Sequence, residues 1–277
     1  MRPKKSLGQH WLQSTKALSQ IIDAADPTAD DIILEIGPGK GVLTERLVFF
    51  AGKVIAIEKD RELIEPLQLR FAEAIAAKRL DIVEADILDF DPEILRFYKD
   101  SPYKVVANIP YYITGAIIEK FLSTLYQPQS MVLLMQKEVA ERIVAKKTKP
   151  FDSAQGKESV LSIAVKAYGN PKIVGKVPPG AFVPPPTVDS AILLIENISR
   201  DFFQGTDEKV FLQLVKTIFG KKRKQIGGSL TDFIGNKVQA LNILQQAVID
   251  TRTRPEELTL KQWKTLTQCC METKSTV

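Results

Sequence analysis

The sequence predicts an α/β protein in which a doubly wound parallel sheet, with helices on both faces, is followed by a small all-helical C-terminal domain. In the first half of the 277 residues, short apolar runs alternate with longer amphipathic stretches, which is the rhythm of β-α-β units. From about Asp207 onward, stretches such as "DEKVFLQLVKTIF" and "NKVQALNILQQAV" instead show helical spacing of their apolar residues. We therefore expect two domains, at residues 1–200 and 201–277.

The strands expected in the sheet are short and apolar. They cover residues 32–36, 53–57, 80–85, 103–107 and 130–135. The helices expected between or after them cover residues 41–50, 60–78, 114–125 and 137–147. A polar loop is expected at 146–159, followed by two more strands, "VLSIAVKAY" (160–168) and "SAILLIEN" (190–197), which flank a proline-rich connection.

Composition and charge indicate a globular protein with a polyanionic partner. No apolar stretch approaches the roughly 20 residues that cross a bilayer, and the basic start lacks the apolar segment of a secretory signal, so we expect a cytoplasmic protein. The net charge is +5, and the run "KKRK" (221–224) has four cations in succession. Such a run indicates contacts with phosphates, although a solvated helix face has the same appearance. The adjacent Cys269 and Cys270 fit neither a disulfide framework nor a metal site, so no metal is expected.

Three strand ends carry residues suited to a nucleoside-containing ligand. "EIGPGKG" (35–41) follows the first strand, and Gly37 and Gly39 permit a tight turn that a ligand can approach closely. A strand–helix turn without a ligand would use the same glycines, and the spacing is not that of a dinucleotide fingerprint. Glu58 ends the next strand, where a carboxylate can accept both ribose hydroxyls, and Asp86 ends the third, where it can accept from an adenine amine. Because parallel strands end at one edge, these side chains are expected to line one site.

The fourth strand ends in "ANIPYY" (107–112), and here the sequence resembles a known family. The glycine turn, the two strand-end acids and N-I-P-Y resemble S-adenosylmethionine-dependent methyltransferases that act on an exocyclic amine. "GQHWL" (8–12) and "FVPPPTVDSAIL" (182–193) are similar to the rRNA adenine N6-dimethyltransferases, above all the bacterial small-subunit enzymes. The resemblance runs from about Lys5 to Leu194, with a weaker echo at 219–230. It implies a Rossmann-like class I methyltransferase sheet.

The resemblance also implies roles for individual residues. Asn108 and Tyr111 would be catalytic, with Phe182 as a second aromatic wall opposite Tyr111, and Asn108 would also contact the cofactor, S-adenosyl-L-methionine. His10 and Leu12 would contact the cofactor too, although many members have Asn at the position of His10. Independently of the resemblance, the charge of the C-terminal run suggests contacts with RNA phosphates for Lys221, Lys222, Arg223 and Lys224.

N-I-P-Y has a physical rationale of its own. The lone pair of an adenine N6 is delocalised into the ring, so the amine is a poor nucleophile. If the Asn108 oxygen and the Ile109 carbonyl accept its two hydrogens, the nitrogen moves toward tetrahedral geometry without a strong base. Pro110 restricts Ile109 to extended conformations, and Tyr111 can stack on the base.

The implied function is dimethylation of two adjacent adenosines near the 3′ end of 16S rRNA during small-subunit maturation. We expect a monomer that binds rRNA and the small ribosomal subunit or its precursor. The alternatives are a 23S rRNA methyltransferase of the erythromycin-resistance type, a non-catalytic ribosome-assembly factor, and a nicotinamide-dependent oxidoreductase. The last of these would explain the glycine turn and Glu58 but not N-I-P-Y.

Overall fold

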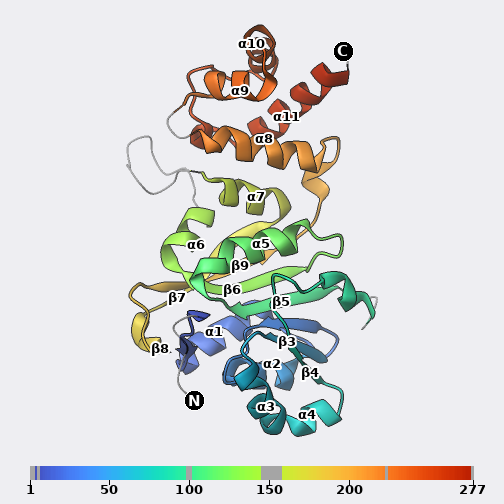
Figure 1. The fold of residues 1–277 in the computed structure, drawn as a ribbon, viewed down its shortest axis with the longest axis vertical. Helices are drawn as coiled ribbons and strands as arrows, with labels where there is room; N and C mark the ends of the chain where they lie inside the picture. Colours follow the sequence, from blue (N-terminus) through green and yellow to red (C-terminus); the bar gives the residue numbers. More distant parts are fainter. Residues whose placement is uncertain (1–3, 5–6, 98–101, 145–157, 222–223, 276–277) are drawn as a thin grey trace. The chain divides into compact units, whose positions relative to one another are not determined.

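The computed structural model describes residues 4, 7–97, 102–144, 158–221 and 224–275 and divides into two compact units (Figure 1). The first unit comprises Met1–Glu141 and Gly169–Ser199, and the second comprises Arg142–Tyr168 and Arg200–Val277. The expected boundary near residue 200 coincides with a boundary between the units, but residues 142–168 belong with the C-terminal helices. Within the described residues, no helix is long and apolar enough to span a membrane.

The first unit is built on a seven-stranded sheet with the order β4-β3-β2-β5-β6-β9-β7. Its strands are β2 (Ile32–Ile36), β3 (Lys53–Glu58), β4 (Leu80–Glu84), β5 (Tyr103–Asn108), β6 (Ser130–Gln136), β7 (Asn170–Val177) and β9 (Ser190–Glu196). The strands from β4 to β6 pair in parallel, whereas β9 is antiparallel to both β6 and β7. The chain order reverses between β2 and β5, which are neighbours in the sheet, and ligands bind at such a switch point in open α/β sheets.

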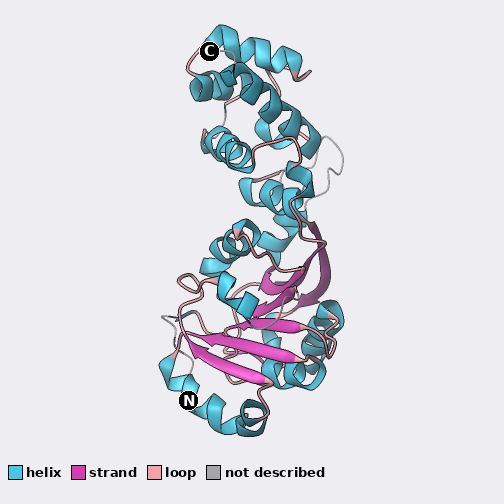
Figure 2. Cartoon of the chain, turned by 90° about the vertical axis from the view of Figure 1, so that its right-hand side faces the viewer, coloured by secondary structure: helices cyan, strands magenta, loops and turns pink. Residues whose placement is uncertain are grey.

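Helices cover both faces of this sheet (Figure 2), which is why its central strands are continuous apolar runs. Those of the first unit are α1 (Thr15–Ala25), α2 (Val42–Phe50), α3 (Arg61–Arg70), α4 (Ala72–Ala76), α5 (Thr114–Ser123) and α6 (Lys137–Val144, which extends into the second unit). Ile21, Leu47 and Leu67, from α1, α2 and α3, pack with Val54 and Val106 of the sheet in one buried cluster. The α/β fold class is thus confirmed.

A two-stranded sheet joins the start of the chain to the proline-rich connection. β1 (Trp11–Leu12) pairs antiparallel with β8 (Phe182–Val183), so that Leu12 lies opposite Phe182. The short 3-10 helices of the chain are η2 (Pro92–Phe97), η3 (Tyr111–Ile113), η4 (Pro179–Ala181), η5 (Asp201–Phe203) and η6 (Pro255–Glu257).

The prediction of a strand at residues 160–168 is wrong, because this stretch forms helix α7 (Val160–Tyr168) in the second unit. A short apolar run reads alike as a buried strand or a buried helix, and the local signals decide. The Ser159 hydroxyl accepts from the backbone N–H of Ser162 (3.1 Å), and Gly169 follows the last helical residue. These are helix start and stop signals. The sheet strand is instead β7, which begins at Asn170 and carries an irregularity between Ile173 and Gly175.

The described part of the second unit is entirely helical apart from its connections. It contains α7, α8 (Glu208–Gly220), α9 (Ile226–Ile234), α10 (Lys237–Gln246) and α11 (Leu260–Ser275). Its core includes the fully buried side chains of Phe211 and Trp263. The thiols of Cys269 and Cys270 are buried in α11 and are not joined in a disulfide.

Candidate active site

A cleft opens in the first unit where β2, β3 and β5 end and where the chain leaves β4. It is partly enclosed and partly open to solvent. The residues that line it are Leu7, Gly8, Gln9, His10, Trp11, Ile36, Gly37, Gly39, Ile57, Glu58, Lys59, Ala85, Asp86, Ile87, Asn108, Ile109, Pro110, Tyr111, Tyr112 and Ile113. The strand-end residues predicted from the sequence therefore meet in one cleft.

The glycine turn forms one side of the cleft. Gly37 and Gly39 have φ angles of 69° and 58°, in the left-handed region that favours glycine. The backbone N–H of Gly37 donates to the Ile57 carbonyl (2.9 Å), which ties the turn to β3. The turn thus brings backbone, with no side chain in between, to the edge of the site.

Glu58 is a buried carboxylate whose two oxygens are both already anchored. Oε2 accepts from the Gly39 N–H (3.0 Å) and Oε1 from the Asp60 N–H (2.8 Å), and the side chain is only 6% exposed. Burial raises its pKa above the usual range, against the lowering effect of these backbone donors. Each carboxylate oxygen has a second lone pair, so the group can still accept two hydroxyls.

Asp86 lies just beyond β4 and is held as an ionised acceptor. Its Oδ2 pairs with Lys59 Nζ (2.6 Å), and its Oδ1 accepts from the Leu88 N–H (3.0 Å). The hydrogen bond from Lys59 lowers the pKa of Asp86 below its usual value. An ionised carboxylate can only accept hydrogen bonds, so Asp86 suits an amine donor.

Asn108 ends β5 with its amide turned in a defined direction. Its Nδ2 donates to the His10 carbonyl (3.1 Å), and its Oδ1 has no partner among the described residues. The Ile109 N–H donates to the Leu134 carbonyl (3.3 Å), which extends the sheet ladder past the strand end. An oriented acceptor is therefore available at the cleft.

Tyr111 is fixed at both its hydroxyl and its ring. The hydroxyl lies 2.7 Å from Oγ of Ser190, a fully buried residue at the start of β9. The ring lies nearly parallel to that of His10, with 6.1 Å between centroids and 17° between planes. Burial raises the pKa of Tyr111, so the phenol stays neutral at physiological pH.

Of the predicted site residues His10, Leu12 and Phe182, only His10 lines the cleft. His10 lines the cleft, and its Nδ1 lies 2.7 Å from the Pro184 carbonyl, so Nδ1 carries the proton. Leu12 and Phe182 are 6% and 2% exposed, and both belong to the core cluster and not to the cleft lining. Leu12 was predicted to contact the cofactor and Phe182 the target base. Both contacts remain predictions, because neither residue lines this cleft.

Comparison with known proteins decides the family. The model of the family described as "Ribosomal RNA adenine dimethylase" matches residues 1–272. The chain belongs to this family. It is 41% identical to Ribosomal RNA small subunit methyltransferase A of Dehalococcoides mccartyi strain CBDB1 over 98% of this chain and 89% of that protein. It is 38% identical to the protein of the same name from Trichormus variabilis, over 95% of this chain and 96% of the relative.

Solved structures agree with the fold of this rRNA adenine dimethylase. The crystal structure of a dimethyladenosine transferase from Plasmodium falciparum superposes with a TM-score of 0.77 at 27% identity, covering 96% of this chain and 98% of that one. The 23S rRNA methyltransferase ErmE gives a TM-score of 0.71 at 24% identity over 94% of this chain and 98% of that one, a likeness of fold alone. The resemblance stated from the motifs is therefore confirmed.

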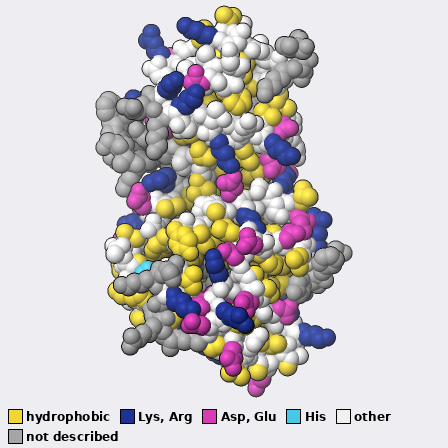
Figure 3. Space-filling view, viewed as in Figure 1, with side chains coloured by type: hydrophobic (Ala, Val, Ile, Leu, Met, Phe, Trp, Pro, Cys, Tyr) yellow, Lys and Arg dark blue, Asp and Glu magenta, His cyan; other side chains and the backbone are white. Residues whose placement is uncertain are grey.

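The basic run of the dimethylase is only partly described. Lys222 and Arg223 lie outside the described residues, while Lys221 Nζ and Lys224 Nζ pair with the same oxygen of Asp232, at 2.5 and 2.9 Å. On the face in Figure 3, basic side chains are interspersed with acidic ones. The RNA contacts of this run remain a prediction, and Asp232 competes for its cations.

Sequence reasoning missed several residues that shape the cleft. Ser190 holds Tyr111, Lys59 holds Asp86, and Asp60 joins Glu58 to the N-terminal segment. Gln9 stands within "GQHWL", but nothing in the spacing of that motif points to Asp60. The sequence does signal one role of Asp60: an Asp directly before a helical stretch is typical of a helix N-cap.

Proposed function

We propose that this dimethylase transfers methyl groups from S-adenosyl-L-methionine to N6 of adenosines in small-subunit rRNA, and that it dimethylates two adjacent adenosines near the 3′ end of 16S rRNA. Relatives about as long as this chain carry the name small subunit methyltransferase A, which supports that substrate. The observation that carries the chemistry is the Asn108 amide, whose Oδ1 is uncommitted beside the cofactor-type residues Glu58 and Asp86.

The cleft residues fit the proposed cofactor. Glu58 would accept the ribose hydroxyls, Asp86 would accept from the adenine amine, and the turn at Gly37 and Gly39 would let the ligand approach the backbone. The Glu58 carboxylate is oriented by two backbone N–H groups and keeps a lone pair on each oxygen for a ligand with hydroxyl donors. When bound, S-adenosylmethionine supplies an electrophilic methyl group on a sulfonium.

Asn108 and its neighbours would activate the target amine. The Asn108 oxygen and the Ile109 carbonyl accept the two N6 hydrogens, and this directs the nitrogen lone pair away from the ring. As the nitrogen gains positive charge, the same two acceptors stabilise it. Tyr111, held by Ser190, offers a ring face to the base. The methylated nitrogen is strongly acidic and would release one proton to solvent, so no strong base is required and His10 needs no proton-transfer role.

The target adenosine has to leave its stack before it can enter the cleft. Contacts with flanking phosphates would supply most of the RNA affinity, and the helical second unit with its run at 221–224 is our candidate for some of them.

Methylation of purified small subunits that lack the modification tests the function. We expect two methyl groups on each of two adjacent adenosines of 16S rRNA, and none on large-subunit RNA under the same conditions. Asn108→Ala should abolish most of the transfer while RNA binding persists. Methylation of 23S rRNA instead would identify the erythromycin-resistance type, and absence of methylation on either RNA would overturn the proposal in favour of an assembly factor.

A further inference from the structure

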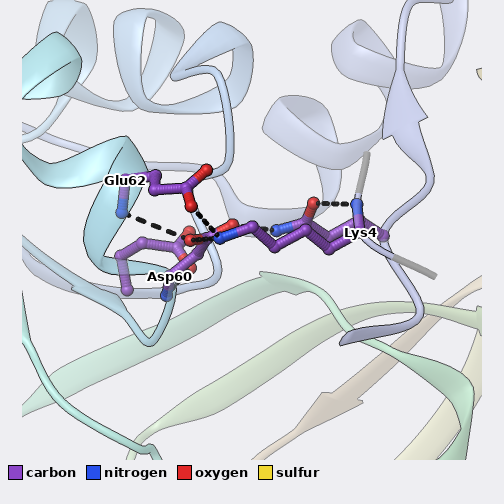
Figure 4. A network of polar contacts seen from close by, with 5 residues as sticks. Lys4, Asp60 and Glu62 are labelled. Atoms are coloured by element: carbon purple, nitrogen blue, oxygen red, sulfur yellow. Dashed lines mark hydrogen bonds and ion pairs between the residues drawn. The ribbon is translucent and has the colours of Figure 1, made fainter. Parts of the chain in front are cut away.

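Asp60 joins the start of the chain to the residues of the cleft. Lys4 Nζ pairs with its Oδ1 (2.7 Å), and Gln9 Nε2 donates to its Oδ2 (2.9 Å). Figure 4 shows the Lys4 side chain reaching Asp60 and the exposed Glu62. The Asp60 side chain is only 5% exposed, whereas that of Lys4 is 34% exposed. Burial alone would raise its pKa, but the hydrogen bonds from Lys4 and Gln9 outweigh it and lower the pKa below the usual value.

The Gln9 amide is held at both its atoms. Its Nε2 donates to Asp60, while its Oε1 accepts from the backbone N–H of Lys4 (2.8 Å). The amide cannot turn over without placing donor against donor at one end and acceptor against acceptor at the other. Gln9 therefore has one orientation, and the backbone that follows it starts from a fixed point.

The next residue, His10, links the N-terminal segment to Asn108 at the end of β5. The carbonyl of His10 accepts from Asn108 Nδ2 (3.1 Å), and the His10 ring is tied to the Pro184 carbonyl (2.7 Å). With Nδ2 bound to that carbonyl, the Asn108 oxygen is the atom left for a substrate. Were the His10 carbonyl to move, the amide would lose the contact that distinguishes its nitrogen from its oxygen.

We propose that Asp60 is a positioning residue of the methyl-transfer site, which acts through Gln9 and the His10 carbonyl to orient the Asn108 amide. This inference rests on the proposed function, because it assigns a task to the acceptor used there. Asp60 also caps α3, since its Oδ1 accepts from the Glu62 N–H (3.2 Å), and its own N–H donates to Glu58. The experiment has to distinguish this positioning role from a purely structural role of Asp60 as the cap of α3.

Two substitutions and their combination separate the roles. Asp60→Asn keeps a good N-cap residue. In one orientation the new NH2 group faces Gln9 Nε2, and in the other it faces Lys4 Nζ, so one of the two donors loses its acceptor. Gln9→Glu places two carboxylates together. The double variant keeps the net charge and restores one hydrogen bond with donor and acceptor exchanged. Asp207→Asn is the control, because Asp207 is also an Asp N-cap, whose side chain accepts from the Val210 N–H at the start of α8 in the second unit.

Single-turnover methylation at saturating RNA and cofactor is the first readout. We expect each single variant to slow transfer about 10- to 100-fold, as small misplacements of reacting groups do, and the double variant to recover to within about threefold of wild type. The effect of Asp60→Asn should largely vanish in an Asn108→Ala background, because a residue that acts through Asn108 cannot act without it. Wild-type rates in both single variants, failure of the double variant to recover, or additive effects with Asn108→Ala would overturn the proposal.

A second readout does not depend on activity. Hydrogen exchange of the Asn108 side-chain amide, followed by NMR, should be faster in both single variants and slow again in the double variant, with no change in Asp207→Asn. Unchanged exchange in the single variants would refute the positioning role, even if wild-type protein methylated no RNA and the proposed function failed. If Asp60→Asn does not fold, Gln9→Ala, which removes the amide without adding a charge, provides the same comparison.

Discussion

Glu58→Gln tests the cofactor site most directly. The glutamine amide is close in size to the carboxylate, but one oxygen becomes an NH2 group. In the structure both oxygens of Glu58 accept backbone N–H groups, from Gly39 and from Asp60. Whichever way the amide turns, its NH2 faces one of these donors, and it offers fewer acceptor sites to the ribose.

The expected loss follows from the hydrogen bonds to the charged group. One such bond contributes about 1.5–3 kcal/mol, which corresponds to a loss in cofactor affinity of roughly 10- to 150-fold. Isothermal titration calorimetry with S-adenosylmethionine and with its demethylated product would measure this loss. The control is Glu62→Gln, which neutralises a carboxylate that is 70% exposed and does not line the cleft.

The same titration has a pH dependence with a defined sign. Burial raises the pKa of Glu58, and only the ionised carboxylate has its full set of acceptor sites for the hydroxyls. Wild-type affinity should therefore be greatest above this raised pKa and fall as the pH drops through it. Glu58→Gln should lack this fall. Unchanged affinity in a folded Glu58→Gln protein, or a loss equal to that of Glu62→Gln, would refute the assignment of Glu58 to the ribose.

Three further predictions concern stability and RNA. Burial raises the pKa of Glu35 from 4.5 to about 8. The contribution of Glu35 to the free energy of unfolding should therefore be greatest below pH 4.5 and fall as the pH rises toward 8, because only the unfolded chain ionises in this range. Glu35→Gln should remove this fall, which amounts to at most about 5 kcal/mol, in urea unfolding at pH 5 and pH 9; the same loss of stability in both proteins would contradict it. Tyr111→Phe should methylate at nearly the wild-type rate yet lose about 1 kcal/mol of stability, because buried Ser190 loses its partner, whereas a wild-type rate in Tyr111→Ala would exclude base stacking. Asp232→Asn should free the two lysines it binds and steepen the salt dependence of RNA binding by about 0.7–0.9 for each additional phosphate that these lysines bind; an unchanged slope would mean that they do not bind phosphate.

Local sequence was sufficient for the strand ends that meet in the cleft. Gly37, Glu58, Asp86 and Asn108 each follow a short apolar run, and parallel strands bring their carboxyl ends to one edge whatever the details of packing. The α/β rhythm is equally local, because it depends on spacing within each stretch. At residues 160–168 the apolar run fits a strand as well as a helix, and the strand prediction is wrong although Ser159 and Gly169 flank the run as helix start and stop signals.

Contacts between distant residues were decided only by the tertiary structure. Asp60 meets Lys4 and Gln9 across more than 50 residues of chain, and Tyr111 meets Ser190 across 79. Leu12, which the motif suggested as a ligand contact, is buried in the core cluster because β1 docks on β8. No spacing rule links such positions, because the connections between them can vary in length. Their contacts depend on how β1, β8 and the start of the chain pack against the sheet.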